Sequence, residues 1–273
     1  MIDNGMEHHM AISETPDFIE AGQGPKVILF HSSVSGARQW RSLMDMLSDR
    51  YHLVAINLFG YGKTPAWSDS RTQSLADQAS LAEPFLTQDG DAVSIIGHSF
   101  GGSVAMKAAA LYKDQVDRLV LIEPNPFYLL EQHGKLEGYK EATKLRDAIK
   151  ASGQSGSWET AAKVFANYWT GKGSWDAMPN ERRSKFAEAL KPNFHEWDAV
   201  MNETTTMAEW EAGLPDRTTV ISANDTVRSI REICGVMEAS VPRWNHKQID
   251  QGGHMAALTK PDLINPIVAD ALA

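Results

Sequence analysis

The segment Val93–Gly102 constrains the fold of this chain more than any other. Its first half is a run of β-forming residues, and the small residues of Ser103–Ala109 that follow it predict a helix. A direct turn from a buried strand into a helix forces Ser99 into a strained backbone conformation with its Oγ pointing outward. Gly97 and Gly101 flank it because a Cβ at either position would collide with the neighbouring strand or helix.

The same turn has a chemical interpretation. The backbone N–H of Phe100 comes at the start of the predicted helix, where developing negative charge is stabilised. An outward-pointing serine hydroxyl beside such a donor is typical of a nucleophile. The alternative is a glycine- and serine-rich turn that carries no chemistry, and the strand before it and helix after it favour catalysis.

Short apolar runs recur along the chain and alternate with helical patterns, which predicts an α/β fold with a mostly parallel sheet covered on both faces. The predicted strands are Lys26–His31, His52–Leu58, Ala92–Gly97, Arg118–Ile122, Thr218–Ala223 and Asn245–Ile249. Between the fourth and fifth strands, about 124–216, no strand is predicted, and a structureless loop of that length would be implausible.

That stretch instead contains three helix-like segments, Gly138–Lys150, Ser157–Trp169 and Glu181–Leu190, and five of the eight tryptophans. We expect a helical cap over 124–216 and a core formed by 1–123 and 217–273. Most of the tryptophans are expected in the core of the cap, with one or two lining a substrate cavity.

The composition of the chain excludes some classes of binding partner. The formal net charge of the 273-residue chain is −9 and no basic run occurs, which argues against nucleic acid or an anionic membrane as a partner. The single cysteine, Cys234, excludes an internal disulfide and is expected to be a small buried apolar residue. The first residues lack a basic-then-apolar leader and no stretch approaches about 20 apolar residues, so a cytoplasmic location is expected.

A serine nucleophile needs a base, and the chain has nine histidines. His254 follows the last predicted strand, and Gly252 and Gly253 before it let the backbone turn sharply and present the imidazole at the edge of the sheet. The side chain of His98 is expected to point away from the reactive face, and His31 is expected to be a structural hydrogen-bonding residue. A surface-loop role for His254 is the alternative.

Two carboxylates could orient that imidazole. Asp225 follows the late strand, the commoner position for this acid, but it could instead cap the helix that begins near Val227. Glu123 follows the strand after the Ser99 helix and its extra methylene lets it reach the histidine, but it could instead bind loop backbone. Counting from the late strand places Thr226 where the usual acid would be, which slightly favours Glu123.

A tetrahedral oxyanion requires two converging donors. The N–H of Ser33, in the loop after the first predicted strand, is the expected partner of the N–H of Phe100. No spacing of His, Cys, Asp and Glu suggests a metal site, and no cofactor is expected.

Several motifs resemble those of the α/β-hydrolase superfamily, and the resemblance covers nearly the whole chain. They are the oxyanion loop at His31–Ser33, the turn at Asn57–Gly62, the Gly97–Gly101 nucleophile turn and the histidine loop at Gly253–Met255. With Arg38–Trp40 and Leu121–Pro124 added, the chain is similar to a bacterial group of capped hydrolases whose substrates are mostly unassigned. The resemblance implies eight strands, a cap after the sixth, and a triad acid following that sixth strand, which supports Glu123.

The chain also departs from the superfamily pattern. Ser32 replaces the usual glycine and Asn57 the usual aspartate, and neither change removes a catalytic group. A serine at position 99 argues against the aspartate-dependent haloalkane dehalogenases and epoxide hydrolases, and against the cysteine-dependent dienelactone hydrolases.

We therefore expect a carboxylesterase-like serine hydrolase that acts on a small-molecule ester or other acyl compound, apolar or aromatic in character. A carbon–carbon bond hydrolase of the meta-cleavage type is the alternative within catalysis. A non-catalytic ligand-binding receptor on the same fold is the alternative outside it. The sequence carries no signal for an oligomeric state.

Overall fold

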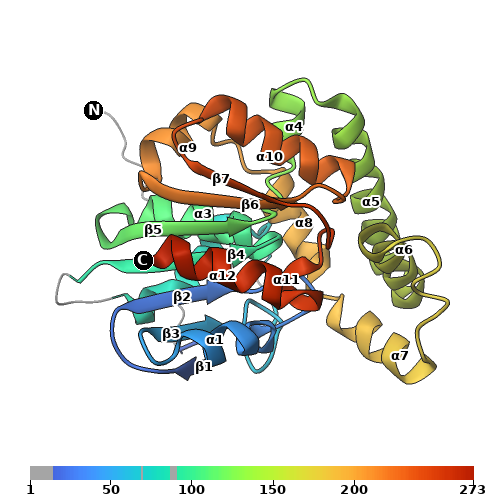
Figure 1. Cartoon of the computed structure of the whole chain (residues 1–273). Coiled ribbons are helices and arrows are strands. Elements are labelled where there is room, and N and C mark those ends of the chain that lie inside the picture. The colour runs from blue at the N-terminus through green and yellow to red at the C-terminus, as the bar shows by residue number, and fades with distance from the viewer. Residues whose placement is uncertain (1–14, 69, 87–90) are drawn as a thin grey trace, which may run out of the picture.

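The six predicted strands are confirmed, and a seventh precedes them. The computed structural model describes residues 15–68, 70–86 and 91–273. The strands are β1 (Phe18–Ala21), β2 (Lys26–Phe30), β3 (His52–Ile56), β4 (Val93–His98), β5 (Val116–Ile122), β6 (Arg217–Ala223) and β7 (Asn245–Ile249). They form one sheet in the order β1-β3-β2-β4-β5-β6-β7, in which β1 alone runs antiparallel to its neighbour. This is the α/β-hydrolase fold (Figure 1).

The short edge strand β1 is the one that the sequence pattern missed. It has only four residues, and none of them is fully buried, so it lacks the continuous apolar run of the central strands. The resemblance implied eight strands, whereas the described residues form seven. Residues 1–14 lie outside the described residues and do not enter this count.

Helices cover both faces of the sheet, and alternate side chains of the central strands point to opposite faces. In β2, Ile28 and Phe30 belong to one core cluster, and Val27 and Leu29 belong to the other. The second face is covered by α1 (Arg41–Leu47), α11 (Ala256–Thr259) and α12 (Pro261–Leu272), which lie in front of the sheet in Figure 1. The first is covered by α2 (Leu75–Ala79), α3 (Phe100–Leu111) and α10 (Arg228–Ser240).

The segment 124–216, between β5 and β6, is helical, and the three helices predicted in it are confirmed. Its helices are α4 (Tyr128–Gln132), α5 (Leu136–Gln154), α6 (Trp158–Thr170), α7 (Asn180–Ala189), α8 (Asn193–Met201) and α9 (Met207–Gly213). In Figure 1 the arrowheads of β2, β4, β5 and β6 point toward α6 and α8. The segment therefore lies against the carboxyl ends of the parallel strands, where ligands bind in open α/β sheets.

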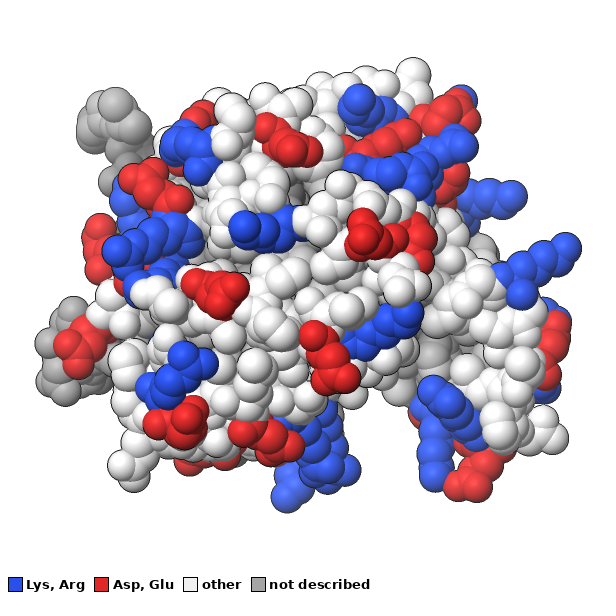
Figure 2. Space-filling model, in the orientation of Figure 1, with Lys and Arg blue, Asp and Glu red and all other residues white. Residues whose placement is uncertain are grey.

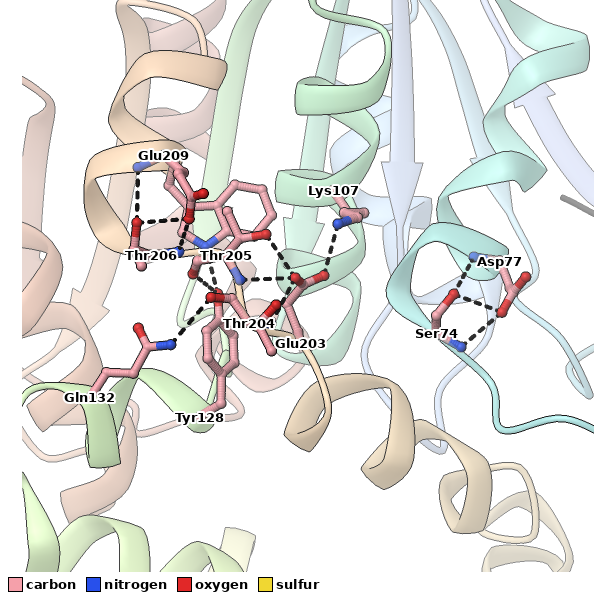
Figure 3. A network of polar contacts seen from close by, with 11 residues as sticks. Ser74, Asp77, Lys107, Tyr128, Gln132, Glu203, Thr204, Thr205, Thr206 and Glu209 are labelled. Atoms are coloured by element: carbon pink, nitrogen blue, oxygen red, sulfur yellow. Dashed lines mark hydrogen bonds and ion pairs between the residues drawn. The ribbon is translucent and has the colours of Figure 1, made fainter. Parts of the chain in front are cut away.

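Polar contacts fasten the loop between α8 and α9 to the core (Figure 3). Glu203 forms an ion pair with Lys107 of α3 at 2.9 Å. The hydroxyl of Tyr128 donates to the Thr205 carbonyl oxygen at 2.7 Å, and Thr206 caps α9. The ion pair holds the loop against α3, the helix that follows Ser99, whereas the Tyr128 contact joins it to α4 of the same helical segment.

Lysine and arginine side chains are interspersed with acidic ones over the face shown in Figure 2. In the part of the chain that the structure describes, no helix combines the length and the apolar character needed to cross a membrane.

Two glycine-to-alanine changes should have opposite effects on stability, because Gly101 lies where α3 closely approaches β2 and Gly235 does not. A Cβ on Gly101 would lie 2.3 Å from the Phe30 carbonyl oxygen and 2.4 Å from that of His31. Gly101→Ala should therefore destabilise the protein by about 1–3 kcal/mol or more. Gly235 lies inside α10 with no atom within 4 Å of its added Cβ, so Gly235→Ala should stabilise by up to about 1 kcal/mol. Urea unfolding of both variants measures this, and equal effects would contradict it.

Candidate active site

Ser99 lies at the junction of β4 and α3 in a conformation that non-glycine residues rarely adopt. Its φ is 55° and its ψ is −120°, and its backbone N–H donates to the Ile122 carbonyl oxygen at 3.0 Å. An added Cβ on Gly97 would lie 2.1 Å from the Gly101 carbonyl oxygen. Only glycine fits there, and the tight turn leaves the Ser99 side chain facing a cavity.

His254 is placed by the glycine turn that precedes it. Gly252 has a φ of 129° and Gly253 a φ of 59°, both in the region that favours glycine. Their N–H groups donate to the carboxylate of Asp225 at 3.1 and 2.7 Å. The loop after β7 is thereby fastened to the loop after β6, and the imidazole is buried, with only 4% of the residue exposed.

The structure brings Ser99, His254 and Glu123 together. The Oγ of Ser99 lies 2.8 Å from Nε2 of His254, and Nδ1 of the same ring lies 2.8 Å from Oε2 of Glu123. With Nδ1 donating to the carboxylate, Nε2 is free to accept the serine proton. Sequence positions 99, 123 and 254 thus form one continuous hydrogen-bonded chain.

Glu123 is held in one orientation by its surroundings. Its backbone has a positive φ of 45°, and its N–H donates to the Ile221 carbonyl oxygen at 2.8 Å. Its Oε1 accepts from the N–H of Ala223 at 2.7 Å, and its Oε2 accepts from the hydroxyl of Thr226 at 2.6 Å. Thr226 occupies the sequence position expected of the usual acid. Its hydroxyl instead supports the carboxylate of Glu123, which faces the imidazole.

The other candidate acid, Asp225, binds the backbone of the histidine loop and does not contact the imidazole. Its carboxylate accepts from Gly252 and Gly253, and no hydrogen bond joins it to the imidazole of His254. The hydrogen bond from the Gly252 N–H is the main cause that lowers the pKa of this exposed carboxyl. The geometry of Asp225 is that of a residue that supports the histidine loop.

Two residues of the cavity wall have backbone N–H groups for which no protein acceptor is found among the described residues. Ser33 and Phe100 both line the cavity with Ser99 and His254. Among the described residues, neither the Ser33 N–H nor the Phe100 N–H donates a hydrogen bond to a protein acceptor. Since backbone donors shielded from water are nearly always paired, two without a protein acceptor near the Ser99 hydroxyl are consistent with a binding site for an oxygen atom.

A second hydrogen-bonded chain ties the loop after β2 to the histidine loop. Ser32, which replaces the usual glycine, donates from its N–H and its hydroxyl to Oε1 of Gln39, at 3.0 and 2.8 Å. Nε2 of Gln39 donates to Nδ1 of His98 at 3.1 Å, and Nε2 of His98 donates to the His254 carbonyl oxygen at 2.9 Å. The side chain of His98 thus binds Gln39 and the backbone of His254, and it forms no hydrogen bond with the Ser99 hydroxyl.

The cavity has a volume of about 530 Å³ and largely apolar walls. The indole of Trp169 stacks on the imidazole of His254, with ring centroids 4.1 Å apart and planes 27° apart. Trp197 also lines the cavity and stacks on Phe127 at 5.2 Å, whereas Trp210 is buried away from it. Two of the five tryptophans of the helical segment thus face the cavity.

The sequence pattern missed one buried acidic residue in the cavity wall. Glu196, on α8, is 1% exposed, and its carboxyl contacts the hydroxyls of Ser33 and Tyr61. Burial raises the pKa of this carboxyl above its usual range. A glutamate within the apolar pattern Phe194–Met201 was the available signal, because acidic residues are seldom fully buried without a reason.

The structure also bears on metal binding and on thiol chemistry. Within residues 15–68, 70–86 and 91–273, no group of three His, Cys, Asp or Glu side chains is arranged to hold a metal ion. The lone thiol of Cys234 is buried in α10, and burial raises its pKa well above the usual value. Such a thiol is unreactive.

The comparison with protein families agrees with this geometry. The model described as "Alpha/beta hydrolase family" matches residues 27–267. The chain belongs to the alpha/beta hydrolase family. Its similarity to a solved alpha/beta hydrolase enzyme from a Medee basin deep-sea metagenome library covers 94% of this chain and 93% of that one, with a TM-score of 0.76 and 14% identity.

Curated relatives match this family member over a shorter stretch. The 2-hydroxy-6-oxo-6-(2'-aminophenyl)hexa-2,4-dienoic acid hydrolase of Metapseudomonas resinovorans is 33% identical over 113 residues, which is 38% of this chain and 37% of that protein. Lipase LipV of Mycobacterium tuberculosis is 37% identical over 102 residues, 37% of this chain and 38% of the lipase. The matches thus span less than two fifths of these relatives.

The buried histidines of this family member predict a loss of stability in acid. Burial lowers the pKa of His98 to about 3 and that of His31 to about 4, from an ordinary value of 6.5. Between these values and 6.5 the unfolded chain binds protons that the folded protein does not. The free energy of unfolding should therefore fall as the pH drops below 6.5, by up to about 1.4 kcal/mol per pH unit for each histidine.

Urea unfolding at pH 7.5, 6.0 and 5.0 measures this effect. His98→Gln serves as the matched variant, because it removes one of the two titrating groups and should give a shallower dependence on pH. Equal free energies of unfolding at pH 5.0 and 7.5 for the unsubstituted protein would refute the expectation.

Proposed function

We propose that this protein is a cofactor-independent, carboxylesterase-like serine hydrolase of small esters or other acyl compounds. One observation carries the proposal: the hydrogen-bonded chain from Ser99 through His254 to Glu123 borders a cavity that Ser33 and Phe100, the residues of the two expected oxyanion donors, also line. A nucleophile, a base with its orienting acid, and an oxyanion site are the parts that acyl transfer requires.

The reaction follows from these positions. Oγ of Ser99 attacks the substrate carbonyl carbon while Nε2 of His254 takes the hydroxyl proton, and Glu123 stabilises the resulting imidazolium. The N–H groups of Phe100 and Ser33 hold the oxyanion. His254 then gives its proton to the leaving group, an acyl-enzyme remains on Ser99, and a water activated by the same imidazole hydrolyses it.

The cavity supports a compact substrate with an apolar or aromatic body. Its volume of about 530 Å³ is within the range of small-molecule sites, and Phe165, Trp169 and Trp197 form part of its wall. Because these three residues come from 124–216, we propose that this segment is a cap on a core made of 1–123 and 217–273. The cap would exclude water from the reacting groups and select the substrate.

The nucleophile assignment is tested with Ser99→Ala. Removing Oγ should abolish turnover of p-nitrophenyl esters and block labelling by a fluorophosphonate probe, with the unfolding transition and the circular dichroism spectrum preserved. Activity near that of the unsubstituted protein would refute the assignment. A folded, unsubstituted protein that neither labels nor hydrolyses would favour the ligand-binding receptor instead.

The acid is tested by comparing Glu123→Gln with Asp225→Asn. Glutamine cannot stabilise the imidazolium, so kcat should fall by about 10³–10⁴ in Glu123→Gln. Asp225→Asn should cost far less, because Asp225 does not contact the imidazole and an amide oxygen still accepts from one of the two glycine N–H groups of the histidine loop. Steady-state kinetics on one p-nitrophenyl ester measure both. Equal small losses would mean that neither residue is the triad acid.

Hydrolysis of a carbon–carbon bond in an acidic diketone is a second candidate. Arg38 and Arg182 line the cavity, and neither has an ion-pair partner among the described residues, so they could receive a carboxylate. The relative from Metapseudomonas resinovorans, by its name, hydrolyses an acid of this kind. Turnover of a ring-cleavage product, but not of p-nitrophenyl esters, by the unsubstituted protein and not by Ser99→Ala would favour this candidate.

A further inference from the structure

Glu196 is a buried carboxyl with no cation beside it. It lies on α8 and is 1% exposed, and no lysine, arginine or histidine of the described residues forms an ion pair with it. Its Oε1 accepts from the Tyr61 hydroxyl at 2.7 Å, and its Oε2 accepts from Nδ2 of Asn193 at 2.7 Å and from the Ser33 hydroxyl. A buried carboxyl without a countercharge is costly, so general stability is a weak explanation for it.

Binding of substrate by this carboxyl is also a weak explanation. Three donors already occupy its two oxygens, and all three belong to the protein. With three of its roughly four acceptor positions occupied, this carboxyl has little capacity left for a ligand. Its function is better sought in the groups that it holds.

Those groups converge on the loop after β2. Val34 has a φ of 68°, which is strained for a β-branched residue and requires support from its surroundings. Its N–H donates at 3.0 Å to the hydroxyl of Tyr61, which in turn donates to Glu196. The carboxyl thus reaches Val34 through Tyr61 and reaches Ser33 directly, so that two consecutive loop residues depend on one side chain.

We infer that Glu196 is a positioning residue that holds the loop of Ser33 and Val34 so that the Ser33 N–H faces the oxyanion. The inference rests on the proposed function. Because Glu196 belongs to α8, the donor pair is complete only when the helical segment is seated on the core. The cap would then contribute to the chemistry through the backbone of the core, as well as by enclosing the substrate.

The experiment measures kcat and KM separately for Glu196→Gln on a neutral p-nitrophenyl ester. In Glu196→Gln an amide NH2 group replaces one carboxylate oxygen and faces donors that can no longer bind it. The loop of Ser33 and Val34 should therefore lose part of its support. Removal of an oxyanion donor costs about 10²–10³ in kcat, and a displaced donor should cost about 10- to 100-fold, with KM changed by less than about threefold. Affinity for a trifluoromethyl ketone, which forms an oxyanion on Ser99, should fall by the same factor as kcat/KM.

Two further variants, each of which removes one of the two routes from Glu196 to the loop, provide the test if Glu196→Gln fails to fold. Ser33→Ala removes the direct contact and keeps the Ser33 N–H, and Tyr61→Phe removes the route to Val34. Each should lower kcat and the affinity for the ketone together. The matched controls are Asp77→Asn, a buried carboxylate that accepts from Arg71 and Ser74 away from the cavity, and Tyr128→Phe, a buried hydroxyl outside it.

The outcomes separate the inference from the proposed function. Loss of kcat and of ketone affinity in the Glu196, Ser33 and Tyr61 variants, but not in the two controls, supports the inference. Unchanged kcat in folded variants, or a loss that the controls share, would overturn it while leaving Ser99 labelled by the fluorophosphonate probe. An unsubstituted protein that neither hydrolyses esters nor reacts with the probe refutes the proposed function itself.

Discussion

The close packing of backbone on backbone around Gly97 and Gly101 is the constraint on which the rest of the site depends. The start of α3 approaches the end of β2 so closely that a single methyl group on Gly101 would overlap two carbonyl oxygens. That approach forces the φ of 55° at Ser99 and brings the loop of Ser33 beside the N-terminus of α3. The strain at one residue is therefore supported by the packing of the whole central sheet.

The parallel sheet explains how residues far apart in the sequence meet. Positions 33, 99, 123, 225 and 254 all follow the carboxyl end of a strand, and parallel register places those ends along one edge of the sheet. Within that edge, hydrogen bonds from each loop to its neighbour determine which side chain faces the imidazole. The loop after β6 supports both the carboxylate of Glu123, through Thr226, and the histidine turn, through Asp225.

Much of this arrangement could be predicted from local patterns. The strands β2 to β5 are mainly buried and contain short apolar runs, and the turns at Ser99 and His254 contain the glycines that their backbone conformations require. The choice between Glu123 and Asp225 was not accessible in the same way, because it depends on which direction two neighbouring loops present their carboxylates. Glu196 was missed for a related reason, since its partners in the core, Tyr61 and Ser33, are 135 and 163 residues away in the sequence.

The stacking of Trp169 on His254 has a consequence for any motion of the helical segment. The indole belongs to α6, whereas the imidazole belongs to a loop of the core. A displacement of α6 that opened the cavity would also uncover the face of the ring and admit solvent to its contacts with Ser99 and Glu123. Water there raises the local dielectric and weakens both hydrogen bonds, so the hydrogen-bonded chain would be strongest with α6 in place and weaker with α6 displaced.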